Sequence, residues 1–343
     1  MKNPESSIYK KLLLIGCLAC ILLLLAGCSF YPFRPDTSKN LSGKYEVTDM
    51  QGTVVQIPHK PMHILTLSMS LDEILLGMVP SDRLAAISNY LDDPKLSVVV
   101  KKAQRVPEKI SSITPPSAER VMALNPDLVL VTEWTRPDYV ATLRDLGFPV
   151  VVCGGGRSLE DIQDNIRLLA RCIDEETRGQ QLIAQMNQLL EEIQAKTAVI
   201  PDEKRKNVVL ISMMTNYGGS GCTYDAMCQN ARVINGIAAA GLKNGQELTK
   251  EMIIKINPDI LFLPNYDDHG TYETDSFIHE YLDDPSLQTV LAICNNACYY
   301  PRESYIYNAS QDFVFGVQEL DYYAYGDSFR QGDNRHISFS GEE

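Results

Sequence analysis

Histidine, tryptophan and excess positive charge are all scarce in this chain of 343 residues. A zinc or manganese site needs about three converging imidazoles and a carboxylate. The 31 lysines and arginines are outnumbered by 44 aspartates and glutamates, giving a net charge of −13, which argues against a nucleic-acid partner. Direct metal capture is therefore kept only as an alternative, because no two histidines are paired at ligand spacing among His59, His63, His269, His279 and His336.

The motifs of common enzymes are also incomplete. Gly154-Gly155-Gly156 follows an apolar run, but the third glycine of a dinucleotide-binding motif is replaced by Leu159, and no P-loop lysine follows. Gly219-Ser220-Gly221 does not have the spacing of a nucleophile elbow. We predict that the protein is not an enzyme and has no cofactor or resident metal. An α/β enzyme is the disfavoured alternative.

Six of the nine cysteines lie in the body of the chain. Their spacing is not the Cys-x-x-Cys of zinc ribbons or redox sites. Disulfides persist in exported proteins and are rare in reducing compartments, so both oxidation states stay open. The candidate local disulfides are Cys222/Cys228 and Cys294/Cys298.

An apolar run from Leu12 to Gly27 follows three lysines and is short for a bilayer span of about 20 residues, which is typical of a secretion signal. It ends in Leu25-Ala26-Gly27-Cys28, which resembles a bacterial lipobox. The resemblance implies cleavage before Cys28 and a lipid on its sulfur. The alternative is an uncleaved anchor helix. Both predict an exported, membrane-anchored protein that faces the periplasm or the cell exterior.

Two segments, 132 residues apart, repeat one pattern. Each has a hydroxyl residue, a glutamate two positions later, Asn-Pro-Asp and an apolar run. The hydroxyl residue predicts a helix N-cap, and the residue before proline predicts the helix end. The apolar runs have the length of buried strands. The repeat therefore predicts two similar α/β lobes, with the paired segments at Ser117–Val131 and Thr249–Leu263.

Between the repeats, apolar residues follow a helical period from residue 175 to about 198, which predicts a rod about 30 Å long. The fold class is α/β, with two lobes of mainly parallel sheet joined by this single long helix and a ligand cleft between the lobes. A shorter helix is expected at 229–239. The predicted segments are a signal peptide at 1–27, a tether at 28–44, lobes at 45–174 and 201–325, the connecting helix at 175–200 and a flexible tail at 326–343.

Ligands of open α/β sheets lie beyond the carboxyl ends of the strands. Loops at these ends are rich in aromatic and hydroxyl side chains, which suit a bulky, flat or amphipathic ligand. The alternative is that several of these side chains only pack against neighbouring loops. The predicted ligand-binding residues are Ser70, Asn89, Tyr90, Trp134, Arg136, Tyr217, Ser220, Tyr266 and Tyr305.

Taken in order, these features resemble the class III substrate-binding proteins of ABC importers, which capture ferric siderophores, haem and cobalamin. The resemblance runs from about Tyr45 to Tyr325 and includes the lipobox, the paired Asn-Pro-Asp segments and the long connector. It implies a small-molecule ligand and a permease dimer with its ATPase as partners. A ferric siderophore is the expected cargo, with cobalamin and then haem as alternatives. A surface scaffold without a small ligand is a further alternative.

The resemblance also implies that Glu119 and Glu251 dock onto arginines of the permease. Both glutamates are expected in the first turn of a helix, where the helix dipole favours an anion. The alternative interpretation is that each glutamate merely stabilises its own helix.

Overall fold

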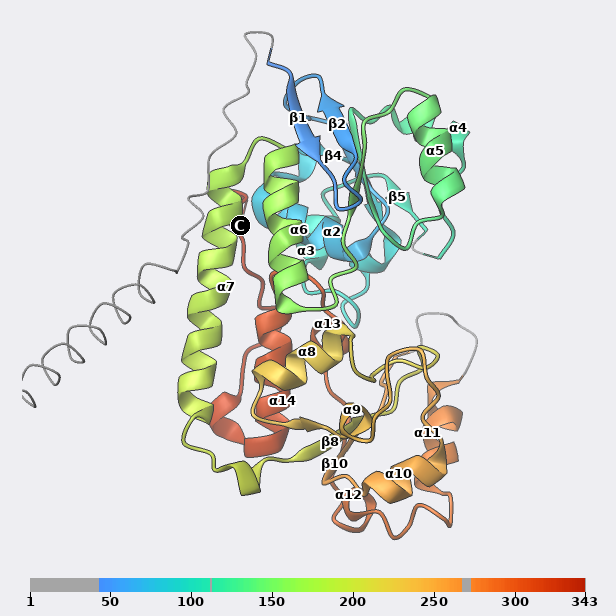
Figure 1. The fold of residues 1–343 in the computed structure, drawn as a ribbon, viewed down its shortest axis with the longest axis vertical. Helices are drawn as coiled ribbons and strands as arrows, with labels where there is room; N and C mark the ends of the chain where they lie inside the picture. Colours follow the sequence, from blue (N-terminus) through green and yellow to red (C-terminus); the bar gives the residue numbers. More distant parts are fainter. Residues whose placement is uncertain (1–42, 112, 267–272, 343) are drawn as a thin grey trace, which may run out of the picture. The chain divides into compact units, whose positions relative to one another are not determined.

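The computed structural model describes residues 43–111, 113–266 and 273–342 (Figure 1). The predicted signal peptide, Cys28 and all of the tether up to residue 42 lie outside these residues, as does His269. Within the described ranges, no helix is both long enough and apolar enough to cross a membrane. The described residues belong to one compact unit by their contacts. We keep the names N-terminal lobe for residues 45–174 and C-terminal lobe for residues 201–325.

The N-terminal lobe is built on a parallel sheet with strand order β5-β4-β3-β6-β7. Alternate residues of its strands point to opposite faces. Val129 and Val131 belong to the cluster that packs on α4 and α5, whereas Leu128 and Leu130 belong to the main core. The strands are β3 (Ile64–Thr66), β4 (Leu84–Ser88), β5 (Lys109–Ile110), β6 (Leu128–Thr132) and β7 (Val150–Cys153). An antiparallel hairpin of β1 (Tyr45–Thr48) and β2 (Val54–Ile57) precedes them.

Helices cover both faces of this sheet, as both faces are apolar. The helices of the lobe are α2 (Met69–Met78), α3 (Val100–Ala103), α4 (Ala118–Leu124), α5 (Pro137–Asp145) and α6 (Leu159–Cys172), with short 3₁₀ turns η1 (Ser81–Arg83) and η2 (Asn89–Asp92).

The C-terminal lobe repeats the plan with a smaller parallel sheet, ordered β11-β10-β8-β9. Its strands are β8 (Asn207–Leu210), β9 (Ile234–Asn235), β10 (Ile260–Phe262) and β11 (Cys298–Tyr299). Its helices are α8 (Thr223–Asn230), α9 (Gly236–Ala239), α10 (Lys250–Ile256), α11 (Thr274–Leu282), α12 (Leu291–Cys294), α13 (Glu303–Ile306) and α14 (Phe313–Tyr325), with a 3₁₀ turn η3 (Asp202–Lys204) before β8.

The single helix predicted at 229–239 is wrong. The chain leaves α8 at Asn230, forms β9 and then starts α9. Asn235 explains the break, because its side chain donates to Gly218 O and to Asp225 Oδ1, each at 2.9 Å. Its Oδ1 also accepts from Ile237 N and caps α9. Such side-chain bonds to the backbone compete with a continuous helix.

The predicted two-lobed α/β fold with a long connecting helix is confirmed. The connector is α7 (Glu176–Thr197), 22 residues long and about 33 Å at 1.5 Å per residue. It contacts α2 and α6 in one lobe and α14 in the other. Buried side chains of α7 belong to the same core as Ile64 of β3 and Phe262 of β10, so one apolar core runs through both lobes. The helix is thus packed along its length against both lobes.

The C-terminal segment differs from the flexible tail predicted at 326–343. After η4 (Asp327–Phe329) it returns to the N-terminal lobe, and Figure 1 shows the C-terminus among the helices of that lobe. Phe339 N donates to Gly77 O at 2.7 Å, and Ile337 is 5 % exposed. The segment is polar in sequence, but its polar groups bond to partners far away in the chain, such as Lys102 Nζ with Ser340 Oγ at 2.9 Å. Burial lowers the pKa of Lys102.

The six described cysteines are free thiols, with neither candidate disulfide formed. Burial raises the pKa of Cys153 to about 12, which makes this thiol unreactive at neutral pH.

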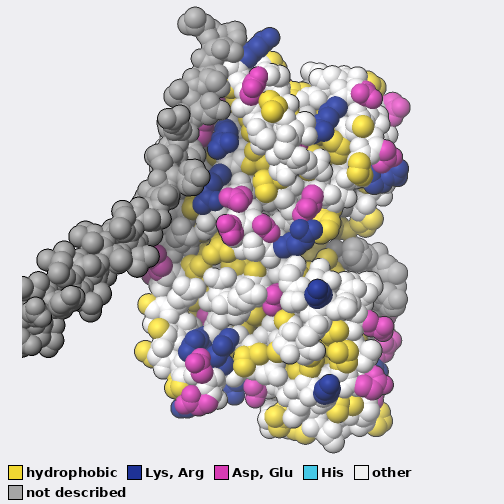
Figure 2. All heavy atoms as spheres, viewed as in Figure 1, with side chains coloured by type: hydrophobic (Ala, Val, Ile, Leu, Met, Phe, Trp, Pro, Cys, Tyr) yellow, Lys and Arg dark blue, Asp and Glu magenta, His cyan; other side chains and the backbone are white. Residues whose placement is uncertain are grey.

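On the surface, acidic and basic side chains are interspersed over the face drawn in Figure 2, with apolar side chains in small groups between them.

Candidate ligand cavity between the lobes

A cavity of about 260 Å³ lies where the carboxyl ends of the two sheets face each other. The N-terminal lobe supplies the β3–α2 loop, the first turns of α2 and the segment after β4, namely Ser68, Met69, Ser70, Glu73, Tyr90 and Leu96. The C-terminal lobe supplies the segments that follow β8, β10 and β11, namely Met213, Met214, Pro264, Tyr266, Glu303, Ser304, Tyr307, Asn308 and Ala309. Both lobes therefore contribute through the loops at which ligands of α/β sheets bind.

Three of the residues predicted to bind ligand, Ser70, Tyr90 and Tyr266, line this cavity. The hydroxyls of Ser68 and Ser70 are hydrogen-bonded to each other at 3.0 Å. Tyr90 is positioned by η2, where its backbone N–H donates to Ser88 Oγ at 3.2 Å. Tyr266 is held through its backbone N–H, which donates to Glu303 Oε1 at 3.1 Å.

Tyr217 and Tyr305 lie behind the lining. The ring of Tyr217 contacts that of Tyr307 at 5.3 Å between centroids, and its hydroxyl accepts from Tyr224 N. Tyr305 is fully buried, accepts from Arg335 N at 2.7 Å and lies under the guanidinium of Arg302. These two tyrosines therefore support the cavity wall instead of forming its surface.

The remaining predicted residues are placed outside the lining. Trp134 is 62 % exposed, and the guanidinium of Arg157 lies 4.2 Å from its ring centroid. Arg136 pairs with Asp138 on the surface. Ser220 joins the backbone of the segment around Lys243, and Asn89 begins η2. Position at a strand end was therefore not sufficient for a place on the wall.

Glu73 and Asn308 are cavity residues that the sequence did not indicate. Glu73 follows Met69 and Ser70 by four and three positions on α2, so the three share one face of the helix. That spacing was the available signal. Asn308 lies in the turn before α14, and its Nδ2 donates to Glu73 Oε2 at 2.9 Å.

Glu73 is 2 % exposed, and its Oε1 has no hydrogen-bond partner among the described residues. Burial raises the pKa of Glu73 well above its ordinary value, and the Asp312 carboxylate raises it further. Both effects favour the protonated acid. Asp72, next to it on α2, is also buried, and burial raises its pKa to about 8.

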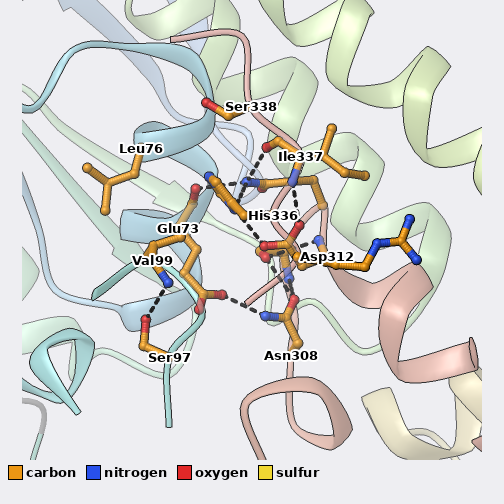
Figure 3. Close-up of polar contacts among 12 residues, drawn as sticks. Glu73, Leu76, Ser97, Val99, Asn308, Asp312, His336, Ile337 and Ser338 are labelled. Atoms are coloured by element: carbon orange, nitrogen blue, oxygen red, sulfur yellow. Dashed lines mark hydrogen bonds and ion pairs between the residues drawn. The ribbon is translucent and has the colours of Figure 1, made fainter. Parts of the chain in front are cut away.

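Behind Glu73, a polar network joins the two lobes to the C-terminal segment (Figure 3). Asp312 Oδ2 is 2.7 Å from His336 Nδ1, and Asp312 Oδ1 accepts from Ile337 N at 2.9 Å. Gln311 Nε2 donates to the backbone oxygen of Glu73 at 2.9 Å. The segment before α14 is thus bonded on one side to Glu73 of α2 and on the other side to the C-terminal segment.

The repeated segments adopt matching structures around Glu119 and Glu251. Each glutamate is exposed and is the second residue of its helix, α4 or α10. Hydrogen bonding from the helix backbone and from the cap lowers the pKa of both carboxyls, so both are anionic at neutral pH. The caps are Ser117 and Thr249, whose hydroxyls accept from Arg120 N and Met252 N.

Among the residues that the structure describes, no group of three or more His, Cys, Asp and Glu side chains is arranged to hold a metal ion. The cavity can offer aromatic rings, thioethers, hydroxyls and carboxyls to a small molecule.

Two α/β lobes with a small cavity at their facing strand ends are the architecture of a solute-binding protein. The chain belongs to the periplasmic binding protein family, whose family model matches residues 64–305.

The names of similar proteins state different ligands, and one of them states none. The chain is 27 % identical over 257 residues to the uncharacterized ABC transporter substrate-binding lipoprotein YvrC of Bacillus subtilis, covering 72 % of this chain and 79 % of that one. It is 20 % identical to the Fe(3+)-citrate-binding protein YfmC of the same organism, over 82 % and 85 % of the two chains. The apo periplasmic heme-binding protein RhuT from Roseiflexus sp. RS-1 superposes with a TM-score of 0.66 at 21 % identity, over 77 % and 97 %.

Proposed function

We propose that this chain is the lipid-anchored receptor of an ABC importer, that it captures an iron–siderophore-type chelate, and that it delivers this cargo to a permease dimer with its ATPase. The observation that carries the proposal is the cavity at the facing carboxyl ends of the two sheets, with Tyr90, Tyr266 and Tyr307 in its wall. Family membership and the name of YvrC, a substrate-binding lipoprotein of an ABC transporter, support it.

The cavity suits an amphipathic chelate. Tyrosine and methionine side chains supply apolar contact and polarisable sulfur, and the hydroxyls of Ser68 and Ser70 supply hydrogen bonds. At about 260 Å³ the space is slightly below the usual range for drug-sized ligands of about 300–1,000 Å³. A large ligand would therefore have to move the lobes apart or leave part of itself outside.

Glu119 and Glu251 are the proposed docking groups. Their matched helices present one exposed, ionised carboxylate from each lobe. Exposed charges of this kind contribute orientation and association rate more than affinity, and salt weakens them.

Anchoring at Cys28 is the remaining part of the proposal. It rests on the Leu-Ala-Gly-Cys sequence after the apolar run. The lipid would hold the lobes at the outer face of the membrane, facing the periplasm or the cell exterior. Labelling with a radioactive fatty acid tests it, since Cys28→Ala should abolish incorporation.

Cobalamin or haem is the alternative cargo on the same fold, and RhuT, by its name a heme-binding protein, illustrates the second case. Calorimetric titration of the protein with ferric chelates, haem and cobalamin separates these candidates. Tight binding of a ferric chelate with one site per chain supports the proposal. Failure of all these compounds to bind would reject it and favour a scaffold without a small ligand.

A further inference from the structure

A second hollow, of about 480 Å³, adjoins the ligand cavity, and we call it the outer hollow. Glu303 and Ser304 belong to the walls of both spaces. The N-terminal lobe contributes Pro94 and Lys95, and the remaining wall comes from the loop after β10, the start of α13 and the C-terminal segment. A ligand too large for the cavity of about 260 Å³ could therefore place its remaining part in a space that both lobes also line.

Lys95 stands at the boundary between the two spaces. Its ammonium lies over the ring of Tyr266, 5.4 Å from the centroid, and Tyr266 is in the cavity wall, as is Leu96. The turn is fixed by its backbone, because Lys95 N donates to Asp93 Oδ1 at 2.8 Å and Leu96 N donates to Asp93 O at 3.1 Å. An ammonium carries three N–H donors, and attraction to an aromatic face leaves them available to a ligand.

The second cation of the outer hollow is already neutralised. Arg302 forms ion pairs with Glu319 and, at 2.8 Å, with Asp333. Lys95, by contrast, forms no ion pair with a carboxylate in the part of the chain that the structure describes. Of the described side chains in the two walls, Lys95 is thus the cation that can still meet an anionic group of a ligand.

The carboxyl groups of the cavity wall are bonded to the protein. Glu303 Oε1 accepts from Asn265 N and Tyr266 N, at 2.9 and 3.1 Å. Burial raises the pKa of Glu73 well above its ordinary value and so favours the neutral acid, to which Asn308 Nδ2 donates at 2.9 Å. With its methionine and tyrosine side chains, the cavity therefore suits the uncharged part of a ligand.

We infer that Lys95 binds a peripheral carboxylate of the ligand in the outer hollow, while the uncharged, metal-binding body of the ligand fills the cavity. This inference rests on the proposed function. It narrows the class of cargo to an amphipathic chelate that has a neutral body and an anionic group at its edge. Because Lys95 belongs to the N-terminal lobe and Tyr266 to the C-terminal lobe, such a ligand would bind at a contact between the lobes.

Magnitude favours a local reading of this charge. The net charge of −13 acts through water and salt, which screen charges beyond about 8 Å at physiological ionic strength. A carboxylate in contact with Lys95 therefore meets mainly the ammonium. An exposed ion pair changes affinity by up to about fivefold, and a charge-assisted hydrogen bond that the ligand shields from water by about tenfold or more.

The test uses the full chain in detergent micelles and two probes with one body. Ferrioxamine B is a ferric tris-hydroxamate whose free amine is either acetylated, which leaves no net charge, or succinylated, which adds one peripheral carboxylate. We expect the succinylated chelate to bind at least about fivefold more tightly, with a preference that shrinks as salt is added. Ferric enterobactin, whose negative charge lies on the metal-binding catecholates, is titrated as a third probe.

The outcomes separate the inference from the proposed function. Equal affinities for the acetylated and succinylated chelates, or tighter binding of the acetylated one, would overturn the inference and leave the proposed function standing. Binding of ferric enterobactin alone would do the same, because the body of that chelate is anionic. If none of the three probes binds, the proposed iron-chelate function falls, and the inference falls with it.

Lys95→Met identifies the residue responsible. It removes the ammonium and keeps an apolar side chain over Tyr266, so the two dissociation constants should come together, whereas Lys95→Arg should retain the preference. Lys101→Met is the matched control, because it removes one exposed lysine of α3 that lies outside both walls, and it should leave the ratio unchanged. If Lys95 only supports Tyr266, Lys95→Met weakens both probes equally, and this result contradicts the assigned role. Far-ultraviolet circular dichroism verifies that the variants are folded.

Discussion

Asn308 Nδ2 donates to Glu73 Oε2 at 2.9 Å and so joins α2 of the N-terminal lobe to the turn before α14, 235 residues later. Both residues are also in the wall of the cavity. One of the contacts between the lobes is therefore part of the surface that a ligand in the cavity would touch. A ligand that bonds to either residue would therefore act directly on this contact between the lobes.

Replacing both proposed docking glutamates should separate ligand binding from transport. We expect Glu119→Ala with Glu251→Ala to leave the dissociation constant of the purified receptor unchanged, since neither residue lines the cavity. Uptake of labelled ligand by cells should fall strongly, because docking loses one carboxylate on each lobe, and the difference from wild type should shrink at high salt, which screens these charges in the wild type.

Glu160→Ala is a close control for this pair. Glu160 is also the second residue of a helix, and that helix is also capped by a serine, Ser158. If loss of a first-turn glutamate acts only on helix stability, Glu160→Ala should reduce uptake as much as either docking substitution does. Normal uptake by the double variant would refute docking through these residues.

Removing the end of the C-terminal segment should destabilise the whole protein. Truncation after Arg335 removes the buried Ile337 and the partners of Asp312 and Lys102. We expect the free energy of unfolding to fall by about 2–5 kcal/mol, from lost apolar burial and stranded polar groups. Urea denaturation followed by circular dichroism measures it. An unchanged midpoint would show that the packed segment contributes nothing.

A second substitution separates two causes of this loss of stability, the unpaired ammonium of Lys102 and the lost apolar packing. Lys102 Nζ donates to Leu76 O and to the hydroxyls of Ser338 and Ser340, so truncation leaves it partly unpaired. Lys102→Met should therefore recover part of the loss in the truncated chain and destabilise the full chain. A double-mutant cycle isolates this coupling.

The sequence predicted best where the signals were local. Asn125 and Asn257 both end their helices in the left-handed conformation, and Asp127 Oδ1 then accepts from His63 N at the start of β3. The hydroxyl caps, Asn-Pro and the apolar run all lie within about fifteen residues of one another, so the repeat could be recognised without tertiary information.

What the sequence could not reveal depended on distant partners. Ser340 is buried because it bonds to Lys102, 238 residues away, whereas its own neighbourhood is polar. Glu73 resembles an ordinary solvated helix residue until Asn308 is placed beside it. Trp134 follows a strand end, as a ligand contact would, but the course of the loop leaves it on the surface under Arg157.

The stability of the protein should depend on pH through Asp321, which is fully buried in α14. Burial raises the pKa of this carboxyl from 3.8 to about 7. Between these values the folded state binds a proton that the unfolded state does not, so stability falls as the pH rises from about 4 to about 7. Asp321→Asn removes this loss while keeping an acceptor for Arg232 N.

Relative to wild type, the Asp321→Asn variant should therefore gain stability as the pH rises. Above pH 7 the gain should be roughly 2–4 kcal/mol, because each pKa unit corresponds to 1.36 kcal/mol. Thermal unfolding of both proteins at a series of pH values measures this difference in stability. The contributions of the other titrating groups are the same in both proteins and cancel. Asp327→Asn is the control, since Asp327 is exposed and paired with Arg330, and its difference from wild type should stay flat. A flat difference for Asp321→Asn as well would reject the argument.

The packing of the connecting helix α7 on α6 should depend on Gly179. A Cβ at this position would lie 2.5 Å from the Cβ of Ala170, closer than two carbon atoms can approach. Gly179→Ala gains about 1 kcal/mol of helix propensity, but overpacking costs about 1–3 kcal/mol. We expect a net loss of stability in urea denaturation. Ala170→Gly should relieve the contact, so the double variant should be more stable than the sum of the single changes predicts. A net gain from Gly179→Ala alone would mean that α6 and α7 can move apart at no cost.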